Sequence, residues 1–186
     1  MNEHLEPIFK ILLPELERAG IDYWVYGGVS VAAYAGKFIR LNKDVDIFVK
    51  NNDFGKVKLI LEDLCNKNNF ALFNHLPPKN SFRPKLDIKI ENEERLSVIP
   101  VYLKDDKVEF KYKDGNQLYS NKILNKIERN ISGFRFFTPP NEYIKKLFSN
   151  HIIARSDKKS RLKIKKDAKA IFSLEELAKL DWRIDQ

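Results

Sequence analysis

The sequence is poor in the residues that crosslink secreted proteins and in the apolar runs that span membranes. Of its 186 residues one is a cysteine, Cys65, so no disulfide forms within the chain, which fits a reducing compartment. No apolar run approaches the ~18 residues of a membrane span. The first ten residues, MNEHLEPIFK, carry acidic side chains and lack a signal-peptide pattern. We therefore expect a cytoplasmic protein with no membrane partner.

Histidine is scarce as well. The three histidines, His4, His75 and His151, show no metal-ligand spacing, so we expect each of them to be structural.

Positive charge is plentiful, with a formal net charge of +8 at pH 7. Apolar residues make up 43% of the chain and aromatic residues 12%, which indicates a folded globular protein. A basic protein favours polyanionic partners such as nucleic acid or nucleotide phosphates. A lysine-rich surface that contacts solvent alone is the alternative. The dense stretch ARSDKKSRLKIKKDAK favours the anion-facing interpretation.

The order of elements predicts an α/β fold with a mixed β-sheet flanked by helices and a helical C-terminal end. We expect a core over residues 1–140 and a helical segment, 141–186, packed on the same domain. Helical spacing of apolar residues predicts a helix over 5–19 that ends at Gly20. The segment IDYWVYGG is typical of a strand, followed by a short helix from Ser30 to about Gly36.

Later segments continue the alternation of strands and helices. DVDIFVK is a strand, and an amphipathic helix follows it with Asp53 as N-cap. FALFNH is a short strand before the proline-marked loop LPPKNSFRPK, and residues 85–112 form a β-meander with turns at NEE and KDD. A further helix begins just after Pro139 and Pro140, and one or two more complete the chain.

Two aspartates, Asp44 and Asp46, lie one residue apart within this second apolar strand. Residues i and i+2 of a strand face the same way, so both carboxylates share a face with Phe48, opposite Val45 and Ile47. Carboxylates that converge on one point suit Mg²⁺, or Mn²⁺, and would repel each other without a cation. The alternative is a solvated face of an edge strand.

The glycines upstream favour the metal-site interpretation. A Gly-Gly turn between a strand and a helix lets the backbone approach a ligand, and the helix N-terminus presents free N–H groups to phosphate. Gly27 and Gly28 hold these positions, and Ser30 adds a hydroxyl donor. A phosphate-binding turn beside a metal site is the layout that nucleotidyl transfer requires.

The stretch resembles the signature of the DNA polymerase β-type nucleotidyltransferase superfamily, which is Gly-Gly or Gly-Ser, a spacer and Asp-x-Asp. Within the superfamily, GKFIRLNKDVDIFV is similar to a run of the lincosamide and aminoglycoside nucleotidyltransferases. Gly36, Arg40, Asp44 and Asp46 match that run, whereas Lys37, Ile39 and Asn42 depart from it. The resemblance implies that Asp44 and Asp46 hold the metals, that Gly27, Gly28 and Ser30 hold the triphosphate of an NTP, and that Arg40 helps to neutralise it. A surface salt bridge is the alternative for Arg40.

The superfamily places a third carboxylate on a neighbouring strand. Asp87 in KLDIKI is our prediction for this catalytic and metal-binding acid. The family pattern would instead place the acid at Ser97, in LSVIPV. If NEE forms the hairpin turn, Asp87 and Ser97 are cross-strand partners, with side chains ~5 Å apart. The alternatives are a surface pair of Asp87 with Lys85 or Lys89, and loss of the third acid.

The leading hypothesis is an enzyme that moves an NMP group from an NTP to a hydroxyl and releases pyrophosphate. The acceptor is either a small molecule such as an antibiotic or a tRNA, which would make the protein a resistance factor or toxin-like. The scarcity of acids beyond the predicted metal ligands disfavours a cationic aminoglycoside. The runner-up is a catalytically degenerate nucleotide- or RNA-binding relative, or a toxin–antitoxin component. A metal-dependent phosphohydrolase is a third interpretation, but it needs no Gly-Gly triphosphate site. The oligomeric state stays open.

Overall fold

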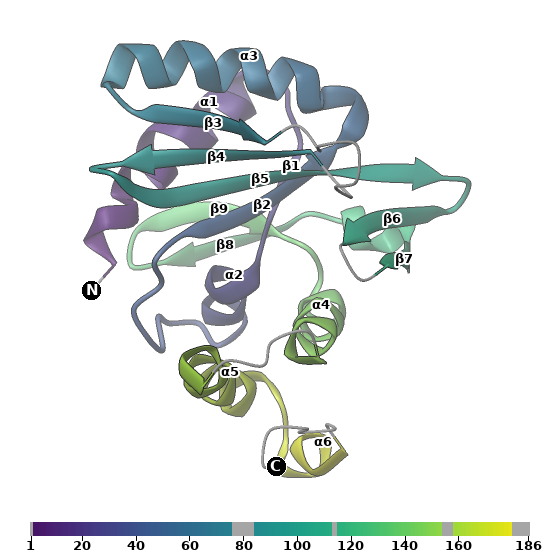
Figure 1. Cartoon of the computed structure of the whole chain (residues 1–186). Coiled ribbons are helices and arrows are strands. Elements are labelled where there is room, and N and C mark those ends of the chain that lie inside the picture. Colours follow the sequence, from purple (N-terminus) through teal and green to yellow (C-terminus); the bar gives the residue numbers. More distant parts are fainter. Residues whose placement is uncertain (1, 76–83, 113–114, 154–157, 180–186) are drawn as a thin grey trace.

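The computed structural model describes residues 2–75, 84–112, 115–153 and 158–179. A twisted sheet forms the centre, with α1 and α3 packed against it, and α2, α4 and α5 lie together beyond its β2 side (Figure 1). The helices are α1 (Leu13–Arg18), α2 (Gly27–Tyr34), α3 (Asn51–Asn68), α4 (Asn141–Ile153), α5 (Lys158–Ile171) and α6 (Leu174–Lys179), with the shorter turns η1 (Glu3–Leu5), η2 (Ile8–Leu12) and η3 (Asn121–Leu124).

Within the described residues, seven strands form one mixed sheet, with the order β1-β2-β5-β4-β3 and β6 and β7 extending from β5. β2 and β5 pair in parallel, and every other pair is antiparallel. A separate hairpin is made by β8 and β9. The strands are β1 (Tyr23–Tyr26), β2 (Val45–Lys50), β3 (Ala71–His75), β4 (Lys85–Ile90), β5 (Glu93–Lys104), β6 (Lys107–Tyr112), β7 (Gly115–Ser120), β8 (Ile127–Ile131) and β9 (Phe134–Thr138).

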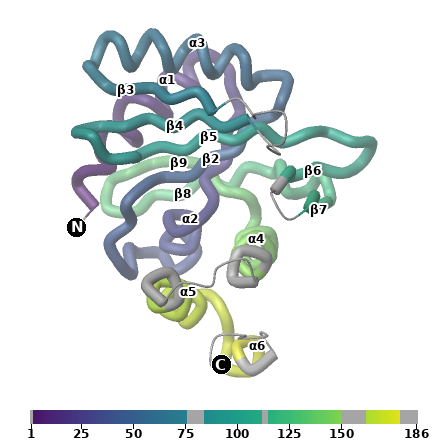
Figure 2. Tube along the Cα trace, viewed as in Figure 1, coloured from purple at the N-terminus to yellow at the C-terminus, as the bar shows by residue number. Residues whose placement is uncertain are grey.

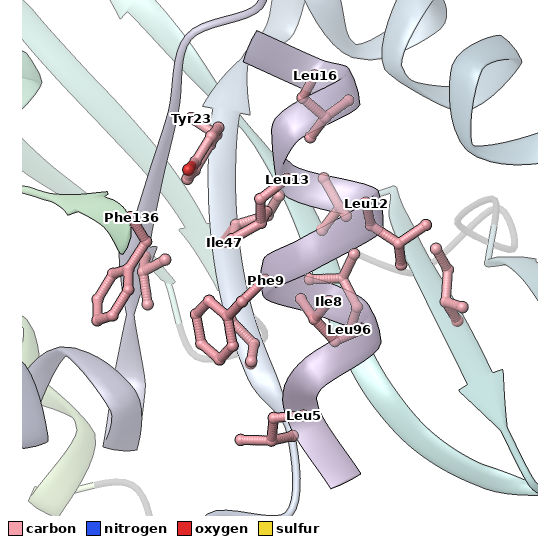
Figure 3. Packing of buried hydrophobic residues seen from close by; sticks show 14 of the residues in the cluster. Leu5, Ile8, Phe9, Leu12, Leu13, Leu16, Tyr23, Ile47, Leu96 and Phe136 are labelled. Atoms are coloured by element: carbon pink, nitrogen blue, oxygen red, sulfur yellow. The ribbon is translucent and has the colours of Figure 1, made fainter. Parts of the chain in front are cut away.

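The largest hydrophobic core fills the space between the sheet and the N-terminal helical segment. Leucine, isoleucine and phenylalanine side chains of η1, η2 and α1 point toward β1, β2 and β9 (Figure 3). Val45, Ile47 and Val49 of β2 enter this core, whereas Phe48 packs in a second cluster with Trp24 and Phe110. This alternation confirms the two faces predicted for β2.

A third cluster joins the C-terminal helices to α2. Val31 of α2 packs with Ile144 of α4 and with Ile164, Ala168 and Ile171 of α5. Consequently α5 lies beside α2 and the loop that leads into β2, although it is more than a hundred residues away in the sequence (Figures 1 and 2).

The predicted fold class is confirmed, because a mixed sheet carries helices on both faces and the chain continues into α4–α6. The predicted helix over 5–19 is divided between η1, a π-helical η2 and α1, and it ends at Gly20 with a φ of 71° as expected. Asp53 is not the N-cap of α3, because that helix begins two residues earlier, at Asn51.

Two further boundaries differ from the predictions. The short helix begins at Gly27 rather than at Ser30. The β4–β5 turn consists of Glu91 and Asn92 rather than NEE. In the described part of the chain, no helix combines the length and the apolar character needed to cross a membrane. Most of the loop LPPKNSFRPK lies outside the described residues.

Candidate active site

Asp44 and Asp46 lie where β2 begins, on the face of the sheet opposite the largest core. Both side chains are half-buried, Asp44 just before the strand and Asp46 within it. β1 runs antiparallel to β2 with Tyr26 opposite Asp46, so the residue that follows Tyr26 lies next to the Asp46 carboxylate. That residue is Gly27.

The close approach of Gly27 to Asp46 requires glycine. Gly27 has a φ of 70°, a backbone conformation that L side chains rarely adopt. A Cβ at this position would lie 2.5 Å from Asp46 Oδ2, far inside van der Waals contact. The first residue of α2 therefore places backbone against a carboxylate, as a ligand-binding turn requires.

Ser30 supports this turn from inside. Its hydroxyl donates to the carbonyl of Gly27, with an oxygen–oxygen distance of 2.8 Å, and its side chain is buried. The hydroxyl proton of Ser30 is thus already donated within the turn. In this geometry Ser30 stabilises the backbone conformation at Gly27. A direct contact of Ser30 with a nucleotide stays a prediction.

Arg40 lies against Gly28, where an added Cβ would collide with Arg40 Nη2 and lie 2.6 Å from Asn42 Oδ1. Its guanidinium donates twice to one carboxylate of α5: Nε to Asp167 Oδ1 at 2.7 Å and Nη2 to Oδ2 at 2.8 Å. Exposed fractions of 15% for Arg40 and 4% for Asp167 make this a buried pair rather than a surface salt bridge. Arg40 therefore links α5 to the Gly27–Gly28 turn. Its contact with phosphate stays a prediction.

The loop before β2 is held by residues from the N-terminal segment. The backbone N–H of Asn42 donates to Asn2 Oδ1 at 2.7 Å, and the ring of His4 contacts the carbonyl of Asn42, also at 2.7 Å. The side-chain Oδ1 of Asn42 is buried and has no hydrogen-bond partner among the described residues. Buried acceptors of this kind usually have a donor, so the loop beside Gly28 has unused hydrogen-bonding capacity.

Asp46, Ser97 and Asp87 form one row across three strands. Ser97 of β5 pairs with Asp46 of β2 on one side and with Asp87 of β4 on the other. The predicted pairing of Asp87 with Ser97 is confirmed. Two strand spacings, about 10 Å, separate Asp46 from Asp87, because β5 lies between them. The strand next to β2, which is β5, thus carries Ser97 in this row, and the acid Asp87 lies one strand farther from Asp46, on β4.

The side chains around Asp87 form a network that the sequence revealed only in part. Asp87 Oδ1 accepts from Ser97 Oγ at 2.8 Å and pairs with Lys85 Nζ at 2.7 Å, and Oδ2 lies 3.0 Å from His75 Nε2. The pair with Lys85 was an alternative for Asp87 at the surface, but only 6% of the Asp87 side chain is exposed. Glu94 joins through Lys85, at 3.1 Å.

Lys85 carried a sequence signal, since it lies two residues before Asp87 on the same face of a strand. His75 carried none, because its approach depends on β3 pairing with β4. Asp167 lies within the basic stretch ARSDKKSRLKIKKDAK, where the sequence analysis assigned it no role, and its pairing with Arg40 depends on the packing of α5. We refer to Gly27, Gly28, Asp44 and Asp46 as the turn half of the site, and to Lys85, Asp87, Glu94 and Ser97 as the hairpin half.

Electrostatics distinguishes Asp44 from Glu94. Burial raises the pKa of Asp44, and the negative charge of Glu94 raises it further, against the opposing charges of Lys163, Lys85 and Arg40. Burial would also raise the pKa of Glu94, but hydrogen bonds from Lys85 and Ser97 hold it below its usual value. Negative charge at Asp44 is therefore costly until a further cation arrives.

Asp44 and Asp46 provide hard oxygen donors on one face, which is the chemistry that Mg²⁺ or Mn²⁺ prefers. Across the described residues, no three side chains of histidine, cysteine, aspartate or glutamate converge to hold a metal by themselves. Mg²⁺ commonly uses one or two carboxylates and takes its remaining ligands from substrate phosphates and water. The turn half fits that arrangement, and a metal-binding role for Asp87 stays a prediction.

A family model described as aminoglycoside-2''-adenylyltransferase matches residues 8–73, the segment that contains the whole turn half. No curated protein sequence matches the chain.

Three solved structures share the fold. The lincosamide antibiotic adenylyltransferase LnuA, bound to lincomycin, has a TM-score of 0.63 at 24% identity and covers 90% of this chain and 97% of its own. ANT(2'')-Ia in complex with adenylyl-2''-tobramycin has a TM-score of 0.62 at 14% identity, over 94% and 93%. The Megavirus polyadenylate synthase has a TM-score of 0.53 at 10% identity, over 91% of this chain and 32% of that one.

The fold and the match over residues 8–73 together confirm the resemblance that the Gly-Gly and Asp-x-Asp motifs indicated. The chain shares its fold with antibiotic adenylyltransferases, and over residues 8–73 it is similar to the family described as aminoglycoside-2''-adenylyltransferase.

Proposed function

We propose that the protein transfers a nucleoside monophosphate from an NTP to a hydroxyl group and releases pyrophosphate, in a reaction that depends on Mg²⁺ or Mn²⁺. The observation that carries the proposal is the contact of Asp46 with Gly27, which brings a carboxylate pair and the N-terminus of α2 to one place. Backbone N–H groups at a helix N-terminus bind phosphate, and carboxylates beside them bind the cation that accompanies it.

Each half of the site has its own task in this reaction. The backbone of Gly27 and Gly28 holds the phosphates, and Asp44 and Asp46 hold the cation, which when bound neutralises charge on the triphosphate. The acceptor oxygen bonds to the α-phosphorus while the bond from that phosphorus to the bridging oxygen breaks, and pyrophosphate leaves. Asp87 is the base that receives the proton of the acceptor hydroxyl.

A small-molecule acceptor is favoured, because LnuA and ANT(2'')-Ia, which share the fold, are antibiotic adenylyltransferases. A tRNA is the second candidate, and the net charge of +8 supports it because phosphate-rich partners gain from a basic surface. Glu94 is an acid that the sequence did not place at the site. It weakens the earlier argument that few acids remain to meet a cationic acceptor.

The proposal is tested by incubating the protein with each of the four α-labelled NTPs, Mg²⁺ and either a panel of antibiotics or total tRNA. We expect labelled acceptor and pyrophosphate in one acceptor class, and neither with the D44N/D46N variant. If the wild-type protein binds Mg·NTP but releases no pyrophosphate with any acceptor, the degenerate nucleotide-binding relative is the correct interpretation.

A further inference from the structure

Glu94 reaches the site because of an irregularity in β5. The β4–β5 hairpin turns at Glu91 and Asn92, whose φ values of 52° and 63° suit a two-residue turn of the I′ type. Lys89 then pairs with Glu94, but the register shifts and Ile88 pairs with Leu96. The extra residue in β5 is therefore Arg95, in a β-bulge.

The bulge changes the face on which Glu94 lies. In a regular strand Glu94 would share a face with Leu96, which is fully buried in the largest core. Instead Glu94 Oε1 accepts from Ser97 Oγ at 3.0 Å, on the opposite face. β-Bulges next to active sites commonly redirect a side chain in this way.

Glu94 and Asp87 share the same two donors. Ser97 Oγ lies 2.8 Å from Asp87 Oδ1 and 3.0 Å from Glu94 Oε1. Lys85 Nζ lies 2.7 Å and 3.1 Å from the same two oxygens. Because each donor contacts each acceptor, the four groups form a closed square, and displacement of one carboxylate changes the contacts of the other.

The square also limits what position 97 can hold. It contains one ammonium group and two carboxylates, and the neutral hydroxyl of Ser97 lies within hydrogen-bond distance of both acids, donates its single proton to one of them at a time and adds no negative charge. A carboxylate at position 97 would face two acids with one lysine among them, and like charges at such distances repel. Positions 94 and 97 therefore accommodate one acid between them.

We propose that Glu94 supplies the acidic group that Ser97 lacks in the strand beside Asp46, and that it is a positioning residue for Asp87 through Lys85 and Ser97. The catalytic part of this inference rests on the proposed function, whereas the mutual exclusion of acids at positions 94 and 97 does not. Glu94 orients Lys85 and Ser97, and these two fix the Asp87 carboxylate through its Oδ1 oxygen.

The first test measures kcat and KM for the NTP in the variants E94Q, E94D and E93Q. E94Q should lower kcat by ten- to a hundredfold with KM changed less than threefold, and E94D should regain at least a third of the activity. Glu93 is the matched control, because it is the neighbouring acid, 60% exposed, and pairs with Arg95 outside the square. An E94Q variant as active as E93Q would overturn the positioning role.

The second test needs no activity and compares the melting temperatures of S97D, E94S and S97D/E94S. S97D should lower the melting temperature, and the double variant should recover at least half of that loss because it again holds one acid beside Asp87. If the double variant is no more stable than S97D, the mutual exclusion is wrong. If the wild-type protein transfers no nucleotide, the proposed function fails, and this second test still decides the structural part of the inference.

Discussion

Asp44 in the turn half and Glu94 in the hairpin half are neighbouring carboxylates whose pKa values shift in opposite directions. Burial and the charge of Glu94 raise the pKa of Asp44. Lys85 contacts both acids of the hairpin half, and its hydrogen bonds keep the pKa of Glu94 low. The comparison teaches that the turn half is suited to receive positive charge from a ligand, whereas the hairpin half contains its own cation.

The largest effect is expected from removal of a carboxylate in the turn half. D46N should lower the rate of NMP transfer by three orders of magnitude or more, which corresponds to ~4 kcal/mol of barrier. The reason is that Asp46 lies against Gly27, where cation and phosphate meet. The measurement is product formation at saturating NTP, with D63N, an exposed acid of α3, as control. A D46N rate within tenfold of wild type would show that the cation binds elsewhere.

Removal of Asp87 from the hairpin half should cost less and act on a different step. D87A should reduce kcat by about two orders of magnitude, ~2.7 kcal/mol, because the acceptor hydroxyl loses its base. KM for the NTP should stay within a few-fold of wild type, since Asp87 lies two strands from Asp46. Steady-state kinetics with varied NTP checks this, and an unchanged kcat would remove Asp87 from the mechanism.

Two helical glycines offer a matched comparison of backbone packing. G28A places a methyl group on Arg40 and Asn42, and overpacking of this kind costs about 1–3 kcal/mol. G55A meets no atom within 4 Å, so alanine should stabilise α3 by about 0.5–1 kcal/mol. Urea unfolding of both variants measures the difference. Equal effects would contradict the close packing of the turn half against Arg40.

The smallest effect concerns pH. The raised pKa of Asp44 means that the folded protein binds a proton more readily than the unfolded chain, so the free energy of unfolding falls as pH rises above about 3.8. D44N removes this loss and should be slightly more stable than wild type at pH 7, with the difference vanishing toward pH 4. Urea unfolding across this range checks it. A D44N variant less stable than wild type at pH 7 without Mg²⁺ would contradict the sign.

Sequence reasoning identified the turn half because its residues lie within one short segment with recognisable spacing. Gly27 and Gly28 follow β1, Asp44 directly precedes β2 and Asp46 lies within it, and the period of two in a strand was sufficient to place the carboxylates on one face. The strand order that brings Tyr26 beside Asp46 follows from the same local pattern.

The hairpin half was predicted in part and for an incomplete reason. Asp87 and Ser97 do pair, but through a turn at Glu91 and Asn92 plus a bulge at Arg95 rather than through NEE. A bulge changes the face of every residue before it, so Glu94 was not predictable from alternation. The Arg40–Asp167 pair joins residues 127 positions apart, and only the tertiary packing of α5 creates it.

The division of work between the two halves is tested most directly by titrating Mg²⁺ with a non-hydrolysable NTP analogue into three proteins: wild type, D44N/D46N and D87A. Isothermal calorimetry should show that D44N/D46N loses binding while D87A binds within threefold of wild type, because the turn half alone receives cation and triphosphate. Wild-type affinity in D44N/D46N, or an equal loss in D87A, would contradict the account.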